Sequence, residues 1–121
     1  MNVRILVVDD DEKILQSIKD VLEHRQYEIC IAKTGREGLK QFEMVNPNLV
    51  ITDIIMPDME GIELIKSIKK KNKNIPIIAM SGDIVGQRFL RASRLLGAID
   101  TLQKPFTGKQ LEEKISSALS R

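Results

Sequence analysis

Hydrophobic and polar positions along this chain follow two alternating patterns. Short apolar runs rich in β-branched residues predict strands at residues 4–8, 28–32, 49–52, 77–80 and 101–103. After each run, apolar residues recur every three or four positions, which predicts an amphipathic helix that buries one face. The chain is therefore expected to repeat a strand followed by a helix five times.

Local signals mark several of the expected helix ends. Thr34 with Glu37, and Thr107 with Gln110, have the spacing of capping boxes, in which two side chains satisfy each other's backbone N–H groups. Gly97 stands where the expected helix at residues 85–96 should end. A lysine cluster ends the helix before the fourth strand and is expected to be a solvated helix end; its members are Lys69, Lys70, Lys71 and Lys73.

Strands that alternate with helices predict an α/β fold with a parallel sheet covered by helices on both faces. The length of 121 residues fits one domain, residues 1–121, and the sequence contains no linker or low-complexity tract. Hydrophobic residues make up 42% and charged residues 30% of the chain, a balance typical of a folded domain rather than a disordered one.

Composition excludes several classes of function. A net charge of +2 and an aromatic content of 3% argue against a nucleic-acid surface. Cys30 is the only cysteine and His24 the only histidine, which excludes an intrachain disulfide, a cysteine-based zinc site and a multi-histidine metal site. No apolar run reaches membrane-spanning length and no signal-peptide pattern opens the chain, so we expect a cytoplasmic protein.

Chemically capable side chains follow four of the five predicted strands. Asp9 and Asp10 follow the first, Asp53 the third, Ser81 the fourth and Lys104 the fifth. In open parallel sheets, ligands bind beyond the carboxyl ends of the strands, near the point where the strand order switches. These residues are therefore expected to gather at one edge of one sheet.

Gathering ionised carboxylates has an energetic cost. Two of them about 5 Å apart repel by roughly 3 kcal/mol at an effective dielectric near 20. A divalent cation and a lysine ammonium would offset that repulsion, and oxygen ligands suit Mg²⁺. A carboxylate surrounded by a magnesium ion, a lysine and a hydroxyl is equipped to act as the nucleophile in phosphoryl transfer.

Each of these residues also has an ordinary structural interpretation. Asp11 is better explained as a helix N-cap than as a metal ligand. Asp53 alone could form a turn, and Lys104 alone could be a surface lysine. His24 is expected at the surface, and Cys30 is expected to be a small core residue. The combination at four strand ends is what favours a site.

Four motifs in order resemble the receiver domain of two-component response regulators, the family of the chemotaxis response regulator. They are VVDDD at residues 7–11, TDIIMPDMEG at residues 52–61, MSG at residues 80–82 and KPF at residues 104–106. The resemblance spans essentially the whole chain. It implies a flavodoxin-like, doubly wound sheet of five parallel strands in the order 2-1-3-4-5.

The resemblance also implies a Mg²⁺ site. Asp10 would bind the ion directly, Asp9 would bind it through water, and Asp53 and the backbone carbonyl of Ile55 would complete the protein's ligands. In the family, the positions of Ile55 and Asp83 influence how fast the phosphoryl group is lost. Ile55 is apolar and cannot orient an attacking water, so a long-lived phosphorylated state is expected.

The phosphoryl group itself would be carried by Asp53, according to the same resemblance. The donor would be a sensor histidine kinase or a histidine phosphotransfer protein. Ser81 would donate its hydroxyl to the phosphoryl group, and Lys104 would pair with the carboxylate and later with the phosphoryl oxygens. The protein would then be a switch that catalyses its own phosphorylation and slow dephosphorylation. The Lys104–Pro105 peptide bond is expected to be cis.

The expected output surface comprises the fourth helix, the fifth strand and the fifth helix. It includes Arg88, Phe89, Arg91 and Arg94, whose arginines could form a docking stripe for an acidic partner or simply a solvated face. Thr101 stands where many receivers have Tyr or Phe, so the usual coupling from the serine or threonine to that aromatic residue is expected to differ here.

Two other functions compete with a phosphorylation switch. A haloacid-dehalogenase-type phosphohydrolase also uses Asp, Lys and Ser or Thr at strand ends, but its nucleophile normally follows the first strand. A degenerate receiver that serves only as an interaction module would not need an intact acceptor site. A stand-alone regulator, monomeric or dimerising on phosphorylation, is favoured over a receiver fused to an output domain. We expect a downstream effector protein as partner, and neither direct nucleic-acid nor membrane binding.

Overall fold

The structure, a computed structural model, describes residues 2–56, 61–82 and 91–120. Residues 91–95 are helical and fall within the helix expected at residues 85–96. Arg88 and Phe89, which the prediction places in the same helix, lie outside the described residues, and so does Asp83. The other elements are β1 (Val3–Val8), α1 (Glu12–Leu22), β2 (Tyr27–Ala32), α2 (Gly35–Val45), β3 (Leu49–Asp53), α3 (Gly61–Lys71), β4 (Ile77–Ser81), β5 (Asp100–Gln103) and α5 (Gly108–Leu119).

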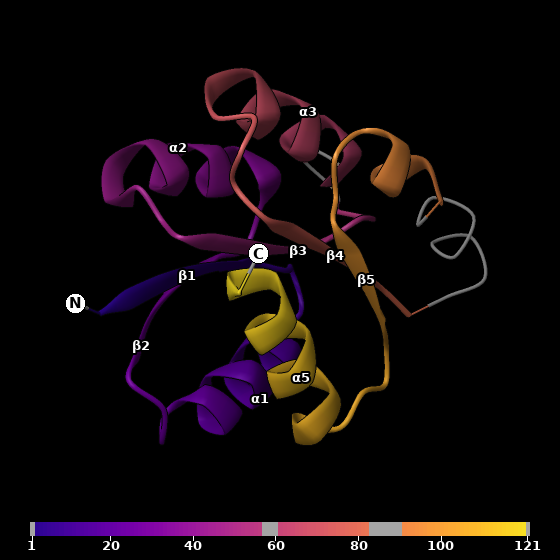
Figure 1. Cartoon of the computed structure of the whole chain (residues 1–121). Coiled ribbons are helices and arrows are strands. Elements are labelled where there is room, and N and C mark those ends of the chain that lie inside the picture. Colours follow the sequence, from indigo (N-terminus) through magenta and orange to yellow (C-terminus); the bar gives the residue numbers. More distant parts are fainter. Residues whose placement is uncertain (1, 57–60, 83–90, 121) are drawn as a thin grey trace.

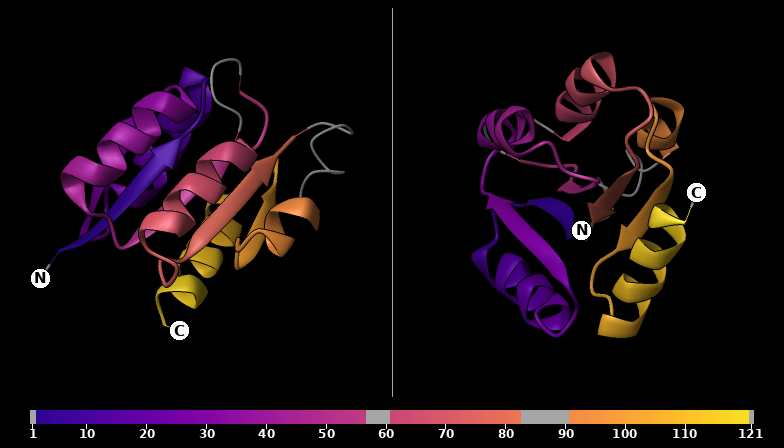
Figure 2. Two further views of the ribbon diagram at one scale, coloured as in Figure 1. Left: turned by 90° about the horizontal axis from the view of Figure 1, so that it is seen from above. Right: turned by 60° about the vertical axis from the view of Figure 1, so that its left-hand side comes forward.

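The five strands form one parallel sheet in the order β2-β1-β3-β4-β5, which confirms the expected fold class. Helices α2 and α3 cover one face of the sheet, and α1 and α5 cover the other (Figure 1). Two further views show this three-layer arrangement from other sides (Figure 2). In the described part of the chain, no helix is both long and apolar enough to cross a membrane.

Each face of the sheet has its own hydrophobic core. Along β1, Leu6 and Val8 pack with α2 and α3, whereas Ile5 and Val7 pack with α1 and α5. The inner strands β3 and β4 are buried along their whole length. This double burial explains why their sequences are continuous apolar runs, and it delivers the polar residues at their ends into a buried environment.

The two predicted capping boxes differ. At α5 the box is complete: Thr107 Oγ1 accepts from the N–H of Gln110 at 3.1 Å, and Gln110 Oε1 accepts from the N–H of Thr107 at 2.9 Å. At α2, Thr34 Oγ1 accepts from the N–H of Glu37 at 3.0 Å, but the Glu37 carboxylate accepts from the N–H of Lys33 at 3.4 Å. The prediction of a complete capping box at Thr34 and Glu37 is therefore wrong, because the Glu37 side chain accepts from Lys33 and not from Thr34.

Lys69 differs from the other members of the lysine cluster. Its ammonium donates to the carbonyl of Ile75 at 2.6 Å and to that of Lys73 at 3.2 Å, beyond the end of α3. Its aliphatic chain lies against Gly97, whose φ of 124° confirms the predicted helix end. Lys69 therefore holds the α3–β4 connection in place, and the prediction of a solvated helix end is wrong for this member of the cluster.

Candidate functional site

The carboxyl ends of the inner strands bring the predicted site residues to one edge of the sheet. Asp53 pairs in register with Met80 in the neighbouring strand, and Ser81 follows Met80 at the end of β4. The N–H of Lys104 donates to the Ser81 carbonyl at 2.8 Å, which joins the end of β4 to the residue that follows β5. The register of β3 with β4 and the backbone hydrogen bond from Lys104 to Ser81 therefore bring Asp53, Ser81 and Lys104 to the same edge.

Asp9, Asp10 and Asp53 converge as the strand ends predict. Each offers a carboxylate oxygen, and these oxygens lie within 4.8 Å of one another. Asp9 is fully buried and Asp53 is 7% exposed, whereas Asp10 is exposed at the solvent side of the group. A solvated cation can therefore approach the cluster from the side of Asp10.

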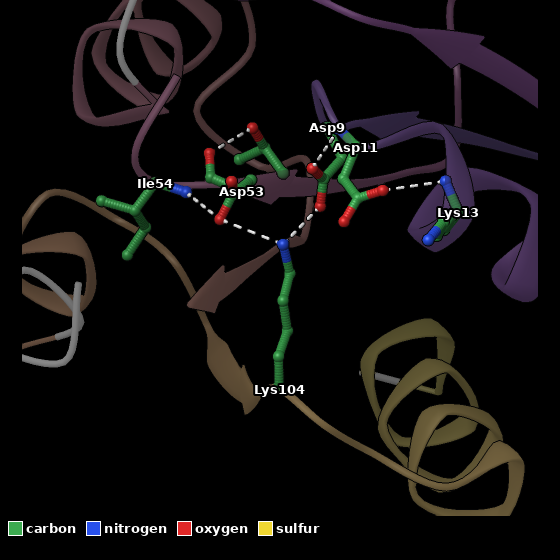
Figure 3. Close-up of polar contacts among 7 residues, drawn as sticks. Asp9, Asp11, Lys13, Asp53, Ile54 and Lys104 are labelled. Atoms are coloured by element: carbon green, nitrogen blue, oxygen red, sulfur yellow. Dashed lines mark hydrogen bonds and ion pairs between the residues drawn. The ribbon is translucent and has the colours of Figure 1, made fainter. Parts of the chain in front are cut away.

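Lys104 lies between the two buried acids (Figure 3). Its Nζ is 2.6 Å from Asp9 Oδ2 and 3.5 Å from Asp53 Oδ1. The resemblance implies a pairing with Asp53, but the closer partner in the structure is Asp9. This preference has a physical reason, because Asp9 has no exposure to water and its charge most requires a buried counter-ion. The Lys104–Pro105 peptide bond is cis, as expected.

Both buried carboxyls are harder to ionise than an exposed aspartate. Burial and the nearby charge of Asp9 raise the pKa of Asp53 to about 6, against the opposing effects of Lys104 and the Ile54 amide. Burial likewise raises the pKa of Asp9, although its hydrogen bond with Lys104 acts in the opposite direction. Burial alone would lower the pKa of Lys104, but its hydrogen bond to Asp9 and the two carboxylate charges outweigh that and raise it.

Asp11 has the structural role expected of it. It is the N-cap of α1, and its Oδ1 accepts from the N–H of Lys13 at 2.9 Å. Its own N–H donates to Asp9 Oδ1 at 2.9 Å. Both oxygens of Asp9 are thus engaged, one by the Asp11 amide and one by Lys104, which leaves Asp10 and Asp53 better placed for direct metal contact.

Ser81 and Ile55 occupy different environments at this edge. Ser81 is 1% exposed at the end of β4, whereas Ile55, two residues after Asp53, is 36% exposed. Gly82 lies against the stem of Lys104, since a Cβ at this glycine would be 3.2 Å from the lysine Cβ. The path of the chain after β4 therefore confines the lysine that reaches the acids.

Sequence patterns missed two residues at the site. The Thr52 hydroxyl donates to the carbonyl oxygen of Asp53 at 2.9 Å, and Gly61 at the start of α3 packs directly on that carbonyl. Thr52 is indistinguishable in the sequence from any other strand residue of high β-propensity. Gly61 belongs to the segment 52–61 that carries the resemblance, but only the structure shows what it touches.

The expected output surface contains a polar network that the sequence did not indicate. Arg94 donates to Asp100 Oδ1 and to Thr101 Oγ1, both at 3.3 Å, and Lys114 of α5 donates to Asp100 at 2.8 Å. Burial would raise the pKa of Asp100, but the hydrogen bonds from Lys114 and from its neighbouring amide lower it. Arg94 is thus tied to β5, while Arg91 is exposed on the helical segment 91–95.

The charges and donor atoms of the cluster fit a hard divalent cation. Three carboxylates and one ammonium leave two negative charges uncompensated when all four groups are ionised. The available ligand atoms are oxygens, which Mg²⁺ prefers, and it commonly binds through one or two carboxylates while keeping several waters. Asp10 and Asp53 provide such a pair.

Comparison with known proteins gives one consistent family. Residues 5–116 match the response regulator receiver domain. The alkaline phosphatase synthesis transcriptional regulatory protein PhoP of Bacillus subtilis is 33% identical over 122 residues, which cover 100% of this chain and 50% of that protein. The response regulator MprA of Mycolicibacterium vanbaalenii is 34% identical and is matched over 52% of its length. This chain therefore spans about half the length of these curated relatives.

Solved structures agree with the sequence relatives. A CheY-like receiver domain protein from Methanospirillum hungatei has a TM-score of 0.89 at 38% identity, over 99% of this chain and 95% of that one. A receiver domain protein from Clostridium thermocellum has a TM-score of 0.89 at 34% identity, over 98% and 95% of the two chains. The match thus covers the whole three-layer fold described above.

The raised pKa of Asp53 predicts how stability depends on pH without metal. The folded state binds this proton more tightly than the unfolded state, where the pKa is near 3.8. The free energy of unfolding of the wild type, relative to Asp53→Asn, should therefore fall by about 2 to 3 kcal/mol as pH rises from 4 to above 6. Urea denaturation in EDTA across this range measures the difference, and parallel profiles for the two proteins would contradict it.

Proposed function

Since this chain belongs to the response regulator receiver domain family of two-component signalling, we propose that Asp53 is the residue that accepts the phosphoryl group. The observation that carries the proposal is the buried Asp53 carboxylate, with Asp9, Asp10 and Lys104 around it. Family membership decides against the haloacid-dehalogenase-type phosphohydrolase, whose nucleophile would follow the first strand. Receivers are not conventional enzymes, and the catalysis proposed here is limited to the domain's own modification.

The proposed reaction is a transfer from a phosphohistidine of a histidine kinase or phosphotransfer protein. An oxygen of the Asp53 carboxylate attacks phosphorus, so that an O–P bond forms while the donor's P–N bond breaks and the imidazole nitrogen keeps the electron pair. A pKa of about 6 leaves Asp53 mostly ionised at neutral pH and makes it more basic than an exposed aspartate. Burial thus makes the carboxylate more basic while leaving most of it ionised at neutral pH.

The proposed direct protein ligands of a Mg²⁺ ion are Asp10, Asp53 and the Ile55 carbonyl. Asp9 would bind the ion through a water molecule. The engagement of both Asp9 oxygens by protein donors supports this division of roles. When bound, the ion supplies positive charge that stabilises the oxygens of the transferring phosphoryl group.

Lys104 and Ser81 are proposed to hold the phosphoryl group after transfer. The Lys104 ammonium, 3.5 Å from Asp53 Oδ1, needs only a short movement away from Asp9 to reach oxygens attached to Asp53. The Ser81 hydroxyl would donate to another phosphoryl oxygen from the end of β4. The backbone N–H of Lys104 donates a hydrogen bond to the Ser81 carbonyl, so a shift of Ser81 would also displace the backbone at Lys104.

Phosphorylation is proposed to shift the domain between two states of its output surface. That surface comprises the helical segment 91–95, β5 and α5, with Arg91, Arg94 and Thr101 as described members. Arg88 and Phe89 are assigned to it from the sequence alone. The hydrogen bond from Arg94 to Thr101 offers a polar link between helix and strand where an aromatic side chain is more usual in receivers.

The partner of this surface is proposed to be an effector protein or an output domain. PhoP is named a transcriptional regulatory protein and is about twice the length of the matched span. A fused output domain and a separate effector protein both fit the proposal. The protein is proposed to act in the cytoplasm. The receiver itself is proposed to make no direct contact with nucleic acid. Dimerisation on phosphorylation is a further form that the switch could take.

Phosphoryl labelling tests the acceptor directly. Incubation with acetyl phosphate and Mg²⁺ should add one phosphoryl group, and peptide mass spectrometry after borohydride reduction should map it to Asp53. Asp53→Asn should abolish the adduct, and Asp10→Asn should slow labelling by at least about tenfold because a metal ligand is lost. A wild-type domain that remains unlabelled would favour the degenerate receiver, and an adduct elsewhere would overturn the assignment.

The phosphorylated state is expected to be long-lived. Ile55 is partly exposed beside the acceptor but has no polar atom in its side chain with which to orient an attacking water. Ile55→Asn should therefore shorten the lifetime several-fold, as measured by loss of radiolabelled phosphate in Mg²⁺ buffer. A wild-type half-life of seconds, or an unchanged lifetime in the variant, would contradict this role of Ile55.

A further inference from the structure

The peptide group that joins Asp53 to Ile54 orients the acceptor carboxylate. Its N–H donates to Asp53 Oδ1 at 3.0 Å (Figure 3) and also to the carbonyl of Met80 in β4 at 3.1 Å. The position of Oδ1 therefore depends on the direction of this N–H bond. If the peptide plane turned, the N–H would leave the carboxylate and the side chain would lose its orientation.

A buried hydroxyl holds the other side of the same peptide group. Thr52 is fully buried, and its Oγ1 donates to the Asp53 carbonyl oxygen at 2.9 Å. Because the carbonyl and the N–H of one peptide group are coplanar, a bond that fixes the carbonyl also fixes the direction of the Ile54 N–H. Thr52 can thus influence the carboxylate without touching it.

Gly61 closes the remaining space around this peptide group. A Cβ built on Gly61 would lie 2.1 Å from the Asp53 carbonyl oxygen and 2.7 Å from the Ile54 Cα. The N–H of Gly61 also donates to the Ile54 carbonyl at 2.8 Å. The first residue of α3 is therefore packed on the backbone of the acceptor, at a distance that only a glycine permits.

From these contacts we propose that Thr52 and Gly61 are positioning residues for phosphoryl acceptance. They act through the peptide group between Asp53 and Ile54, which they hold in the orientation that aims the carboxylate. This inference rests on the proposed function, in which Asp53 is the nucleophile. Small misplacements of a nucleophile cost large factors in rate, so residues that merely hold its backbone affect the reaction.

Two substitutions at Thr52 separate positioning from stability. Thr52→Val keeps the shape of the side chain and removes the hydroxyl, whereas Thr52→Ser keeps the hydroxyl and removes a buried methyl group. Thr52→Val should lower the rate constant at saturating acetyl phosphate by about five- to tenfold, the factor expected for one lost hydrogen bond, with an unchanged half-saturating donor concentration. Thr52→Ser should react at close to the wild-type rate.

A spectroscopic measurement without metal or phosphoryl donor supports the kinetic one. The backbone amide resonance of Ile54 reports its hydrogen bond to Asp53, so its proton shift should change in Thr52→Val and stay near the wild-type value in Thr52→Ser. Equal rates in the wild type and Thr52→Val, or equal losses in Val and Ser, would overturn the role of Thr52, because a purely structural role predicts no such order.

Gly61→Ala tests the second residue, with Gly97→Ala as a control for backbone cost. Gly97 has a positive φ and lies before β5, away from the carboxyl ends of the strands, so its substitution should destabilise the fold but leave the labelling rate of folded protein unchanged. Gly61→Ala should lower that rate by at least about tenfold. Equal rates in the two glycine variants would remove Gly61 from the proposal.

The same experiments distinguish failure of this inference from failure of the proposed function. If wild-type Asp53 is not labelled, the proposed function fails. If Asp53 is labelled and both Thr52→Val and Gly61→Ala react as the wild type does, only the positioning roles fail. Should Gly61→Ala not fold, the Thr52 pair decides between these outcomes alone.

Discussion

Electrostatic repulsion among three carboxylates at the end of one sheet is the constraint on which the rest of this structure depends. Asp9 and Asp53 are buried, and Asp10 adjoins them at the surface. Lys104 offsets part of the negative charge, but burial and the nearby charge of Asp9 still raise the pKa of Asp53 to about 6. The two uncompensated negative charges favour a divalent cation at this site, and in the proposed function that cation would offset the charge of an incoming phosphoryl group.

The path of the chain connects this charged cluster to the surface proposed for output. Lys104 contacts Asp9, and the strand that precedes it contains Asp100 and Thr101, which bind Arg94 of the helical segment 91–95. One short strand thus has its carboxyl end in the site and its amino end in the polar network. Movement of Lys104 from Asp9 toward a phosphoryl group on Asp53 would pull on that strand. In the proposed switch, this strand would transmit the change from the site to Arg94.

Sequence patterns could predict what depends on periodicity and on strand ends. The strands, the parallel sheet and the convergence of Asp9, Asp10 and Asp53 followed from such patterns, because carboxyl ends of parallel strands share one edge. Contacts that depend on atomic distances could not be predicted. The closer pairing of Lys104 with Asp9, the carbonyl contacts of Lys69 and the Thr52 hydrogen bond each depend on which of several neighbours lies nearest.

The most direct test of the account is the effect of Mg²⁺ on the free energy of unfolding of the wild type and of Asp10→Asn. Mg²⁺ at about a hundred times its dissociation constant should stabilise the wild type by about 2 to 3 kcal/mol. Asp10→Asn should be at least as stable as the wild type without metal, since one repelling charge is gone, and should gain little from Mg²⁺. Loss of about 2 kcal/mol in the metal-free variant would instead assign Asp10 a structural hydrogen-bonding role, and a wild type indifferent to Mg²⁺ would contradict the account.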